Sequence, residues 1–317
     1  MLNRFGSRIG STWKKHTSHP TNNFFKIVEV GPRDGLQNEK KIISTEDKVD
    51  LINKLSRSGL KTVEVTSFVS PKWVPQMADH NEVISKITKF EGVSYPVLVP
   101  NMAGLTNALK NKDVTEIAVF CASSTSFSLK NTNCDIENSV KRSCDVTRSA
   151  VESGLKVRGY ISCVIGCPYE GRIKPNVTAM IAERLLEAGC YEISLGDTIG
   201  VGSAGSMNLL LDEVLAVTPA SKLAVHCHDT YGQALTNVLV ALNKGIRTAD
   251  SSVAGLGGCP YAKGATGNLA TEDLVYLLHD LGFETGINLE ELVATGNWIC
   301  AKMGRVNSSR AGLALRK

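Results

Sequence analysis

The sequence predicts a single (β/α)8 TIM barrel, in which eight parallel strands alternate with helices around a closed sheet. Three features support this prediction: eight short strand-like runs, helical segments between several of them, and glycine where helix gives way to strand. The runs span residues 26–30, 61–66, 95–99, 115–120, 156–161, 190–195, 222–227 and 247–252. They are rich in Val, Ile, Tyr and Thr, which is typical of β-strands.

Segments between these runs carry helix signals. Four apolar side chains repeat at the spacing of one helical face: Leu235, Val238, Leu239 and Leu242. Ser44, with Asp47 three residues later, indicates the start of a helix that reaches Leu55.

Glycine marks the joints at which a helix ends one or two residues before a strand begins. These glycines are Gly59, Gly154, Gly189 and Gly245. A left-handed glycine ends a helix readily, and a repeated helix–glycine–strand unit predicts a parallel sheet. Eight such strands without a long linker favour a closed barrel over an open sheet. The first strand is not followed by a glycine-rich nucleotide-binding turn, which also argues against an open nucleotide-binding sheet.

Charge and composition divide the chain into three predicted parts. Residues 1–23 carry basic, Ser and Thr residues without acids, as a transit peptide does, whereas a disordered basic tail is the alternative. The barrel is predicted over 24–305, and 306–317 form a C-terminal tail without a peroxisomal S-K-L ending. The net charge of +4 comes from the first 25 residues, so no nucleic-acid partner is expected. No apolar run approaches the roughly 18 residues that span a bilayer, so no membrane partner is expected.

The nine cysteines form no CxxC pair, and a chain of this length needs no disulfides to fold. Most are therefore predicted to be reduced, buried thiols.

Polar residues cluster where the predicted strands end, which in such barrels is the catalytic face. They are Arg33 and Asp34 after the first strand, Glu64 in the second, Asp197 after the sixth, His226 and His228 at the seventh, and Asn268 after the eighth. Scattered surface polarity would not gather at one end of so many strands.

His226 and His228 lie two residues apart, so strand alternation places both imidazoles on one face, inside the barrel. Cys227 then points toward the helices. A lone histidine is more often a core residue than a ligand, but a same-face pair near Asp34 favours a metal site. Imidazole, carboxylate and amide ligands suit Mg²⁺ or Mn²⁺, while Zn²⁺ is an alternative that thiolates would favour more.

Two further groups are candidates for catalysis. Arg33 directly precedes Asp34 in a turn bracketed by Pro32 and Gly35, where its guanidinium is placed to stabilise an oxyanion. Cys259 lies in a glycine-rich segment, which offers little surface in which to bury a thiol. It is therefore predicted to be a proton-transfer group on a loop that closes over substrate, rather than a structural cysteine.

Three segments together resemble the hydroxymethylglutaryl-CoA lyase family: GPRDGLQNE (31–39), HCHDTYGQA (226–234) and GLGGCPYAKGATGNLATED (255–273). The resemblance covers residues 24–305. It implies cleavage of hydroxymethylglutaryl-CoA to acetyl-CoA and acetoacetate, in a homodimer of the mitochondrial matrix that serves ketone-body formation and leucine breakdown.

The resemblance also implies roles for single residues. The divalent cation ligands would be Asp34, His226, His228 and Asn268. Arg33 would bind the thioester carbonyl of the acyl-CoA substrate, and Cys259 would be the catalytic cysteine. Glu64, Asp197 and Glu272 match positions tied to catalysis or substrate positioning.

Two other functions remain open at this point. A barrel synthase that condenses acetyl-CoA with a 2-oxo acid would share Arg33, Asp34 and the histidine pair, but would not need the cysteine loop. A non-catalytic barrel that binds a CoA ester or a metal would need neither Arg33 nor Cys259.

Overall fold

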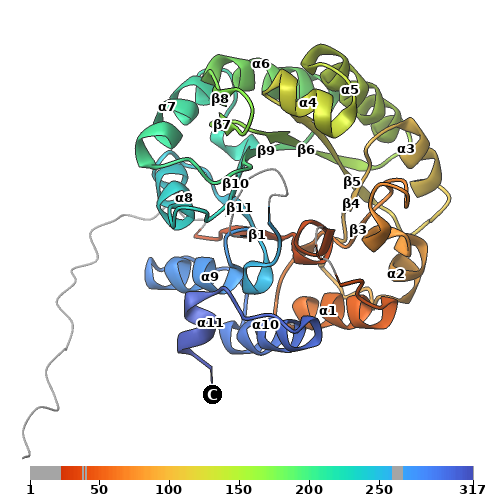
Figure 1. Cartoon of the computed structure of the whole chain (residues 1–317), viewed down its shortest axis with the longest axis vertical. Helices are drawn as coiled ribbons and strands as arrows, with labels where there is room; N and C mark the ends of the chain where they lie inside the picture. Colours follow the sequence, from red (N-terminus) through yellow and green to blue (C-terminus); the bar gives the residue numbers. More distant parts are fainter. Residues whose placement is uncertain (1–22, 38, 40, 259–266, 317) are drawn as a thin grey trace, which may run out of the picture.

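The computed structural model describes residues 23–37, 39, 41–258 and 267–316. A parallel sheet lies at its centre, and helices surround the sheet (Figure 1). The strands are β1 (Lys26–Glu29), β2 (Thr62–Val63), β3 (Thr66–Ser67), β4 (Val97–Leu98), β5 (Glu116–Ala122), β6 (Lys156–Ser162), β9 (Glu192–Asp197), β10 (Leu223–Cys227) and β11 (Thr248–Ser251). A separate antiparallel hairpin pairs β7 (Gly166–Cys167) with β8 (Gly171–Arg172).

The sheet closes on itself because β2 and β3 are two halves of one strand. Its order runs β2-β1-β11-β10-β9-β6-β5-β4-β3, so the two ends of the order belong to neighbouring residues. Between the halves, the Glu64 amide donates to Glu29 of β1, and the Val65 amide donates to Pro96 just before β4. Counting β2 and β3 as one strand therefore gives the eight strands of a parallel barrel.

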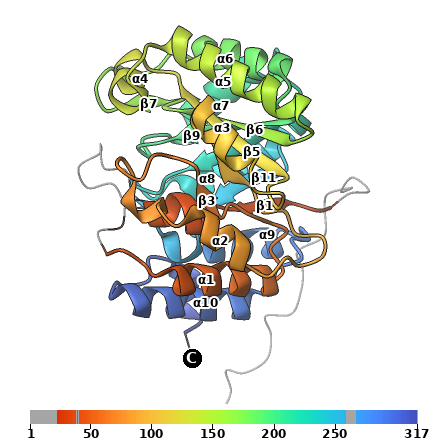
Figure 2. The same ribbon diagram turned by 90° about the vertical axis from the view of Figure 1, so that its right-hand side faces the viewer.

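Most connections between strands carry a helix that packs outside the sheet. The α-helices are α1 (Thr45–Arg57), α2 (His80–Lys86), α3 (Met102–Ala108), α4 (Thr125–Thr132), α5 (Ile136–Glu152), α6 (Pro175–Ala188), α7 (Ala204–Leu215), α8 (Ala234–Asn243), α9 (Thr271–Asp280), α10 (Leu289–Met303) and α11 (Arg310–Ala314). Shorter helical turns are η1 (Gly31–Gly35), η2 (Pro75–Met77), η3 (Ala220–Lys222) and η4 (Val253–Gly255). Figure 2 shows α4 and β7 on the same side of the barrel.

The main hydrophobic core lies between the sheet and this ring of helices. Along β9, Ile193 and Leu195 belong to that core, while Glu192 and Ser194 make polar contacts inside the barrel. This alternation follows from the two-residue period of a strand. The barrel interior is thus more polar than the layer around it.

The structure confirms the predicted strands and joints. Each of the eight runs contains a barrel strand, and the four joint glycines have positive φ, from 81° at Gly154 to 115° at Gly189. The hydroxyl of Ser44 caps α1 by accepting from the Asp47 amide at 3.1 Å. The apolar stripe of α8 was only partly right, because Leu239 is 37% exposed and the buried face instead includes small residues such as Ala241.

The remaining expectations concern the cysteines and the chain ends. Of the described cysteines, Cys134 is half-buried, the other seven are buried, and all eight are free thiols. Cys259 lies outside the described residues. The predicted tail contains helix α11, whose first turn binds the Asp273 carboxylate of α9 through the Ala311 amide at 2.7 Å. Within the described ranges, no helix is long and apolar enough to cross a membrane.

We expect Gly59→Ala to destabilise the barrel more than Gly154→Ala. Both glycines end a helix with positive φ, which costs an alanine about 1–2 kcal/mol. A Cβ at Gly59 would also lie 2.0 Å from the carbonyl oxygen of Gly286, whereas a Cβ at Gly154 meets nothing within 4 Å. Thermal unfolding of both variants measures the difference. Equal decreases in Tm would contradict the close packing at Gly59.

Candidate active site

A cavity of about 580 Å³ opens at the carboxyl ends of the barrel strands. Its walls come from the carboxyl-terminal parts of β3, β4, β5, β6, β9 and β10, from the segments that follow β1, β3, β4, β9 and β10, and from α4. Among the predicted site residues, Arg33, Asp34, His226 and His228 line it, together with Gly258. The expected convergence of polar groups at this end of the barrel is therefore present.

The two histidines extend from β10 toward the cavity. His226 is the penultimate residue of this strand, and His228 follows its end, with ring centroids 5.3 Å apart. Cys227 between them faces the opposite side and belongs to the hydrophobic core, as alternation predicts. Each of His226, His228 and Asp34 offers one ligand atom, and these three atoms lie within 4.8 Å of one another.

Asp34 reaches this group from the turn η1 after β1. Its Oδ1 accepts from the Arg33 guanidinium at 2.8 Å, and its Oδ2 accepts from the Asn268 amide nitrogen at 2.8 Å. Asn268 comes from the other end of the chain and forms an antiparallel bridge with His228. Gly257, with φ of 108°, permits this approach, because a Cβ there would lie 2.7 Å from the Asn268 amide nitrogen.

The donor atoms of this group fit a divalent cation. The side-chain oxygen of Asn268 and Nδ1 of His228 are buried without a hydrogen-bond partner among the described residues. Buried polar atoms are normally satisfied, so such atoms require a partner of another kind. Carboxylate, amide oxygen and imidazole together form a set that Mg²⁺ or Mn²⁺ accepts, with room for substrate oxygens.

Arg33 lies between two carboxylates at the rim of the barrel interior. Its Nε donates to Oε2 of Glu64 at 2.9 Å, one terminal nitrogen lies 2.8 Å from the same oxygen, and the other bonds Asp34. The Tyr160 hydroxyl also donates to Oε2 of Glu64, at 3.1 Å. These contacts engage three of the roughly five N–H groups of a guanidinium and leave the others for a ligand oxygen.

The charges around the site determine which groups are ionised. Burial would raise the pKa of the Asp34 carboxyl, but Arg33 and the two imidazoles outweigh burial and lower that pKa to about 2. Burial and the neighbouring His226 lower the pKa of His228 to about 4. Burial also opposes the charge on His226, yet its hydrogen bond to Asp250 raises the pKa of His226 above the usual 6.5. At neutral pH, Asp34 is thus a carboxylate and His228 a neutral imidazole.

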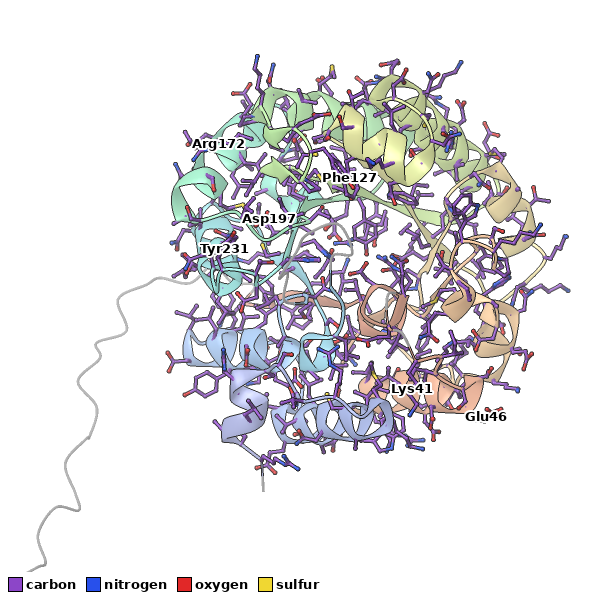
Figure 3. The ribbon with its side chains drawn as sticks, viewed as in Figure 1. Lys41, Glu46, Phe127, Arg172, Asp197 and Tyr231 are labelled. Atoms are coloured by element: carbon purple, nitrogen blue, oxygen red, sulfur yellow. The ribbon has the colours of Figure 1, made fainter. Side chains whose placement is uncertain are left out.

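Asp197 makes its contacts outside the barrel interior. It is the last residue of β9, in register with Cys227, so it shares the outward face of that residue (Figure 3). Its carboxylate accepts from the backbone amides of Val201 at 3.2 Å and Gly202 at 2.8 Å. The side chain therefore holds the loop after β9.

Glu272 likewise binds backbone rather than the cavity. Both of its oxygens accept from the Ala254 amide, at 3.0 and 2.9 Å, in the turn η4. Ala254 has a positive φ of 57°, which is unusual for a residue with a side chain. Burial raises the pKa of Glu272 to about 8. Glu272 thus holds the turn that leads into the glycine-rich segment.

Comparison with known proteins identifies the family. The model of the HMGL-like family matches residues 24–299, which is most of the chain.

The chain belongs to the HMGL-like family.

Three relatives show how much of an HMGL-like protein the chain spans. It is 57% identical to the mitochondrial hydroxymethylglutaryl-CoA lyase of Mus musculus over 292 residues, covering 92% of this chain and 90% of that protein. It is 55% identical to the cytoplasmic 3-hydroxy-3-methylglutaryl-CoA lyase of Danio rerio, over 92% and 87% of the two chains. The crystal structure of the lyase from Pseudomonas aeruginosa superimposes with a TM-score of 0.90 at 53% identity, over 93% and 98% of the chains.

Three residues of the HMGL-like site were not found from the sequence. Tyr160 lines the cavity and bonds Glu64, and Asp250 bonds both His226 and Arg158. Arg158 and Tyr160 lie in a predicted strand. An arginine within a strand that is expected to be buried could have indicated a polar contact inside the barrel. Asp250 lies in the eighth run, but its partners are on other strands and only the folded barrel reveals them.

We expect cation binding by this HMGL-like protein to compete with one proton, not two, between about pH 5 and the raised pKa of His226. In this window the metal-free protein carries an extra proton on His226 that the cation must displace, while His228 stays neutral because its pKa is about 4. Mn²⁺ affinity should then fall about tenfold per pH unit, which titration followed by electron paramagnetic resonance can measure. A fall of about a hundredfold per unit would show that both imidazoles titrate together.

Proposed function

We propose that this protein is a divalent-metal-dependent carbon–carbon lyase that cleaves 3-hydroxy-3-methylglutaryl-CoA to acetyl-CoA and acetoacetate. One observation carries the proposal beyond the names of its relatives: Asp34, His226, His228 and Asn268 meet beside the Arg33 guanidinium in one cavity. A reaction that passes through an enolate needs such an arrangement of ligands and a fixed positive group.

Asp34, His226, His228 and Asn268 would hold Mg²⁺ or Mn²⁺. A bound divalent cation supplies Lewis acidity, which lowers the pKa of a coordinated hydroxyl group. The buried, unpartnered oxygen of Asn268 supports its part in this set. The part of Asp34 in this set is supported as well, because Arg33 and Asn268 fix the orientation of its carboxylate.

Arg33 would stabilise the thioester enolate. When the tertiary hydroxyl of the substrate loses its proton to solvent and becomes a ketone, the adjacent carbon–carbon bond breaks. Its electron pair then forms the enolate of acetyl-CoA, whose oxygen carries negative charge. The N–H groups of Arg33 that do not bind Glu64 or Asp34 would donate to this oxygen. Because Glu64 and Tyr160 hold the guanidinium in place, little reorganisation is needed during the reaction.

Cys259 would donate the proton that converts the enolate carbon into the methyl group of acetyl-CoA. Cys259 lies outside the described residues, but Gly258, which directly precedes it, lines the cavity. A thiol proton is a suitable acid for a carbanion-like carbon. We assign Glu64 to the positioning of Arg33, and Asp197 and Glu272 to the positioning of the loops that they hold.

The names of the relatives and the composition of the first residues support a proposal for where the protein acts. HMGL-like relatives include proteins named mitochondrial and cytoplasmic. The transit-peptide composition of residues 1–23 favours the mitochondrial matrix, where the reaction would serve ketone-body formation and leucine breakdown. We further propose a homodimer, as the family resemblance implies, with a small-molecule acyl-CoA as substrate.

Purified protein supplied with Mg²⁺ and hydroxymethylglutaryl-CoA should release acetoacetate, because the proposed cation ligands and Arg33 lie together in the folded chain. Removal of the cation by a chelator should abolish the release, and added Mg²⁺ or Mn²⁺ should restore it. Acetoacetate is measured by coupled reduction to hydroxybutyrate. Condensation of acetyl-CoA with a 2-oxo acid, without any cleavage of the lyase substrate, would instead identify a synthase.

Arg33→Gln should lower kcat by at least about 10²- to 10³-fold, the usual cost of one oxyanion donor. This variant also removes the positive charge that pairs with Glu64 and Asp34, so a second variant, Arg33→Lys, is needed beside it. Lysine keeps the charge but cannot bind two carboxylates and an enolate together, so kcat should still fall while Tm changes little. Arg172→Gln, at an exposed arginine of β8, is the control. Near-normal turnover in Arg33→Gln would rule out this role.

A further inference from the structure

A buried carboxylate that the reaction does not use lies beside His226. Asp250 of β11 is in register with His226 of the neighbouring strand β10, so both side chains point into the barrel. Oδ2 of Asp250 lies 3.2 Å from Nδ1 of His226. The other ring nitrogen, Nε2, lies 4.0 Å from Oδ2 of Asp34, on the side of the candidate cation ligands.

Asp250 is itself held by three donors from other strands. Arg158 binds both of its oxygens, at 3.2 and 2.7 Å, and the Ser194 hydroxyl donates to Oδ2 at 2.6 Å. Arg158 is on β6, which is separated from β11 by β9 and β10 in the sheet, so this contact spans the barrel interior. An ionised carboxylate can only accept hydrogen bonds, so Nδ1 of His226 must be the donor to Asp250.

The buried or partly buried charges around Asp250 balance one another, because two basic side chains pair with two carboxylates. Arg158 also bonds Glu192 at 2.7 Å, and Glu192 is paired with Lys26 at 3.3 Å. Buried ion pairs of this kind are often no more stabilising than apolar side chains of similar volume. A gain in stability therefore does not explain these buried ion pairs. Holding the His226 imidazole in a fixed orientation does explain them.

We infer that Asp250, held by Arg158 and Ser194, is a positioning residue that keeps the proton of His226 on Nδ1 and directs Nε2 toward Asp34 as a ligand for the divalent cation. A carboxylate behind a metal-binding histidine fixes the ring and makes it a better ligand. His228 has no such support, since no carboxylate among the described residues is hydrogen-bonded to its ring. The inference rests on the proposed cation site, but not on the identity of the substrate.

Mn²⁺ binding to the purified full chain tests this role without any turnover. Asp250→Asn keeps the shape but removes the charge, and the Mn²⁺ affinity should fall about 10- to 100-fold. Glu116→Gln is the matched control. Glu116 is also buried in the barrel and bonded to two hydroxyls, those of Ser94 and Tyr191, at 2.5 Å each. Its substitution should leave the affinity within about twofold, because its bonds are not to the cation ligands.

Histidine-selective nitrogen NMR of the metal-free protein, at a pH above the raised pKa of His226, gives a second readout. His226 should carry its proton on Nδ1 in the wild type and should populate both tautomers in Asp250→Asn. If Asp250→Asn fails to fold, Ser194→Ala decides, because it removes one neutral donor to the oxygen that faces His226. That variant should weaken Mn²⁺ binding by about 2- to 10-fold.

Unchanged Mn²⁺ affinity in the folded Asp250 variant, or in Ser194→Ala where that variant decides, would overturn the inference. Equal losses in Asp250→Asn and Glu116→Gln would do the same, since they would mean that any buried carboxylate matters equally. A wild-type protein that binds Mn²⁺ tightly but releases no acetoacetate from hydroxymethylglutaryl-CoA would reject the proposed function and leave this inference standing.

Discussion

Arg33 lies between Glu64 and Asp34 where the barrel interior meets the cavity, and the rest of the site depends on that placement. Two carboxylates this close together in a poorly solvated position repel each other strongly. Burial still raises the pKa of Glu64, but the guanidinium helps to keep Asp34 ionised, and so allows Asp34 to accept the amide of Asn268. Asn268 uses its amide nitrogen in this way, and its side-chain oxygen has no hydrogen-bond partner among the described residues.

The apolar core of the barrel and its charged residues lie in different layers of the structure. Apolar side chains fill the space between the sheet and the helices, whereas the interior holds charged residues such as Arg158, Asp250 and Glu192. Charges in a barrel interior are costly unless every one is paired. In return, the strands hold them in fixed register, and a side chain such as His226 receives its partner from the neighbouring strand rather than from a loop.

The sequence was sufficient for the features that depend on local pattern. Strand composition, the helix-ending glycines and the two-residue spacing of His226 and His228 are all local, and all were confirmed. Which side of a strand a terminal residue faces is less local: Asp197 ends its strand as expected, but its register with Cys227 turns it toward the loop backbone. The contact of Arg158 with Asp250 could not be predicted from the sequence, because it crosses the barrel and forms only once the sheet has closed.

The two histidines of the site are consequently not equivalent. His226 is fixed from behind by Asp250, within the rigid strands of the barrel. His228 follows the strand and is bridged to Asn268, while the backbone of Asp229 donates to Gly267. Gly258, at the other end of the same segment, lines the cavity. On that side, the Leu256 carbonyl accepts from the amide nitrogen of Asn268, a candidate cation ligand, at 3.0 Å. A change in how His228 and Asn268 are held would therefore also move Leu256 and Gly267, described residues on either side of that segment.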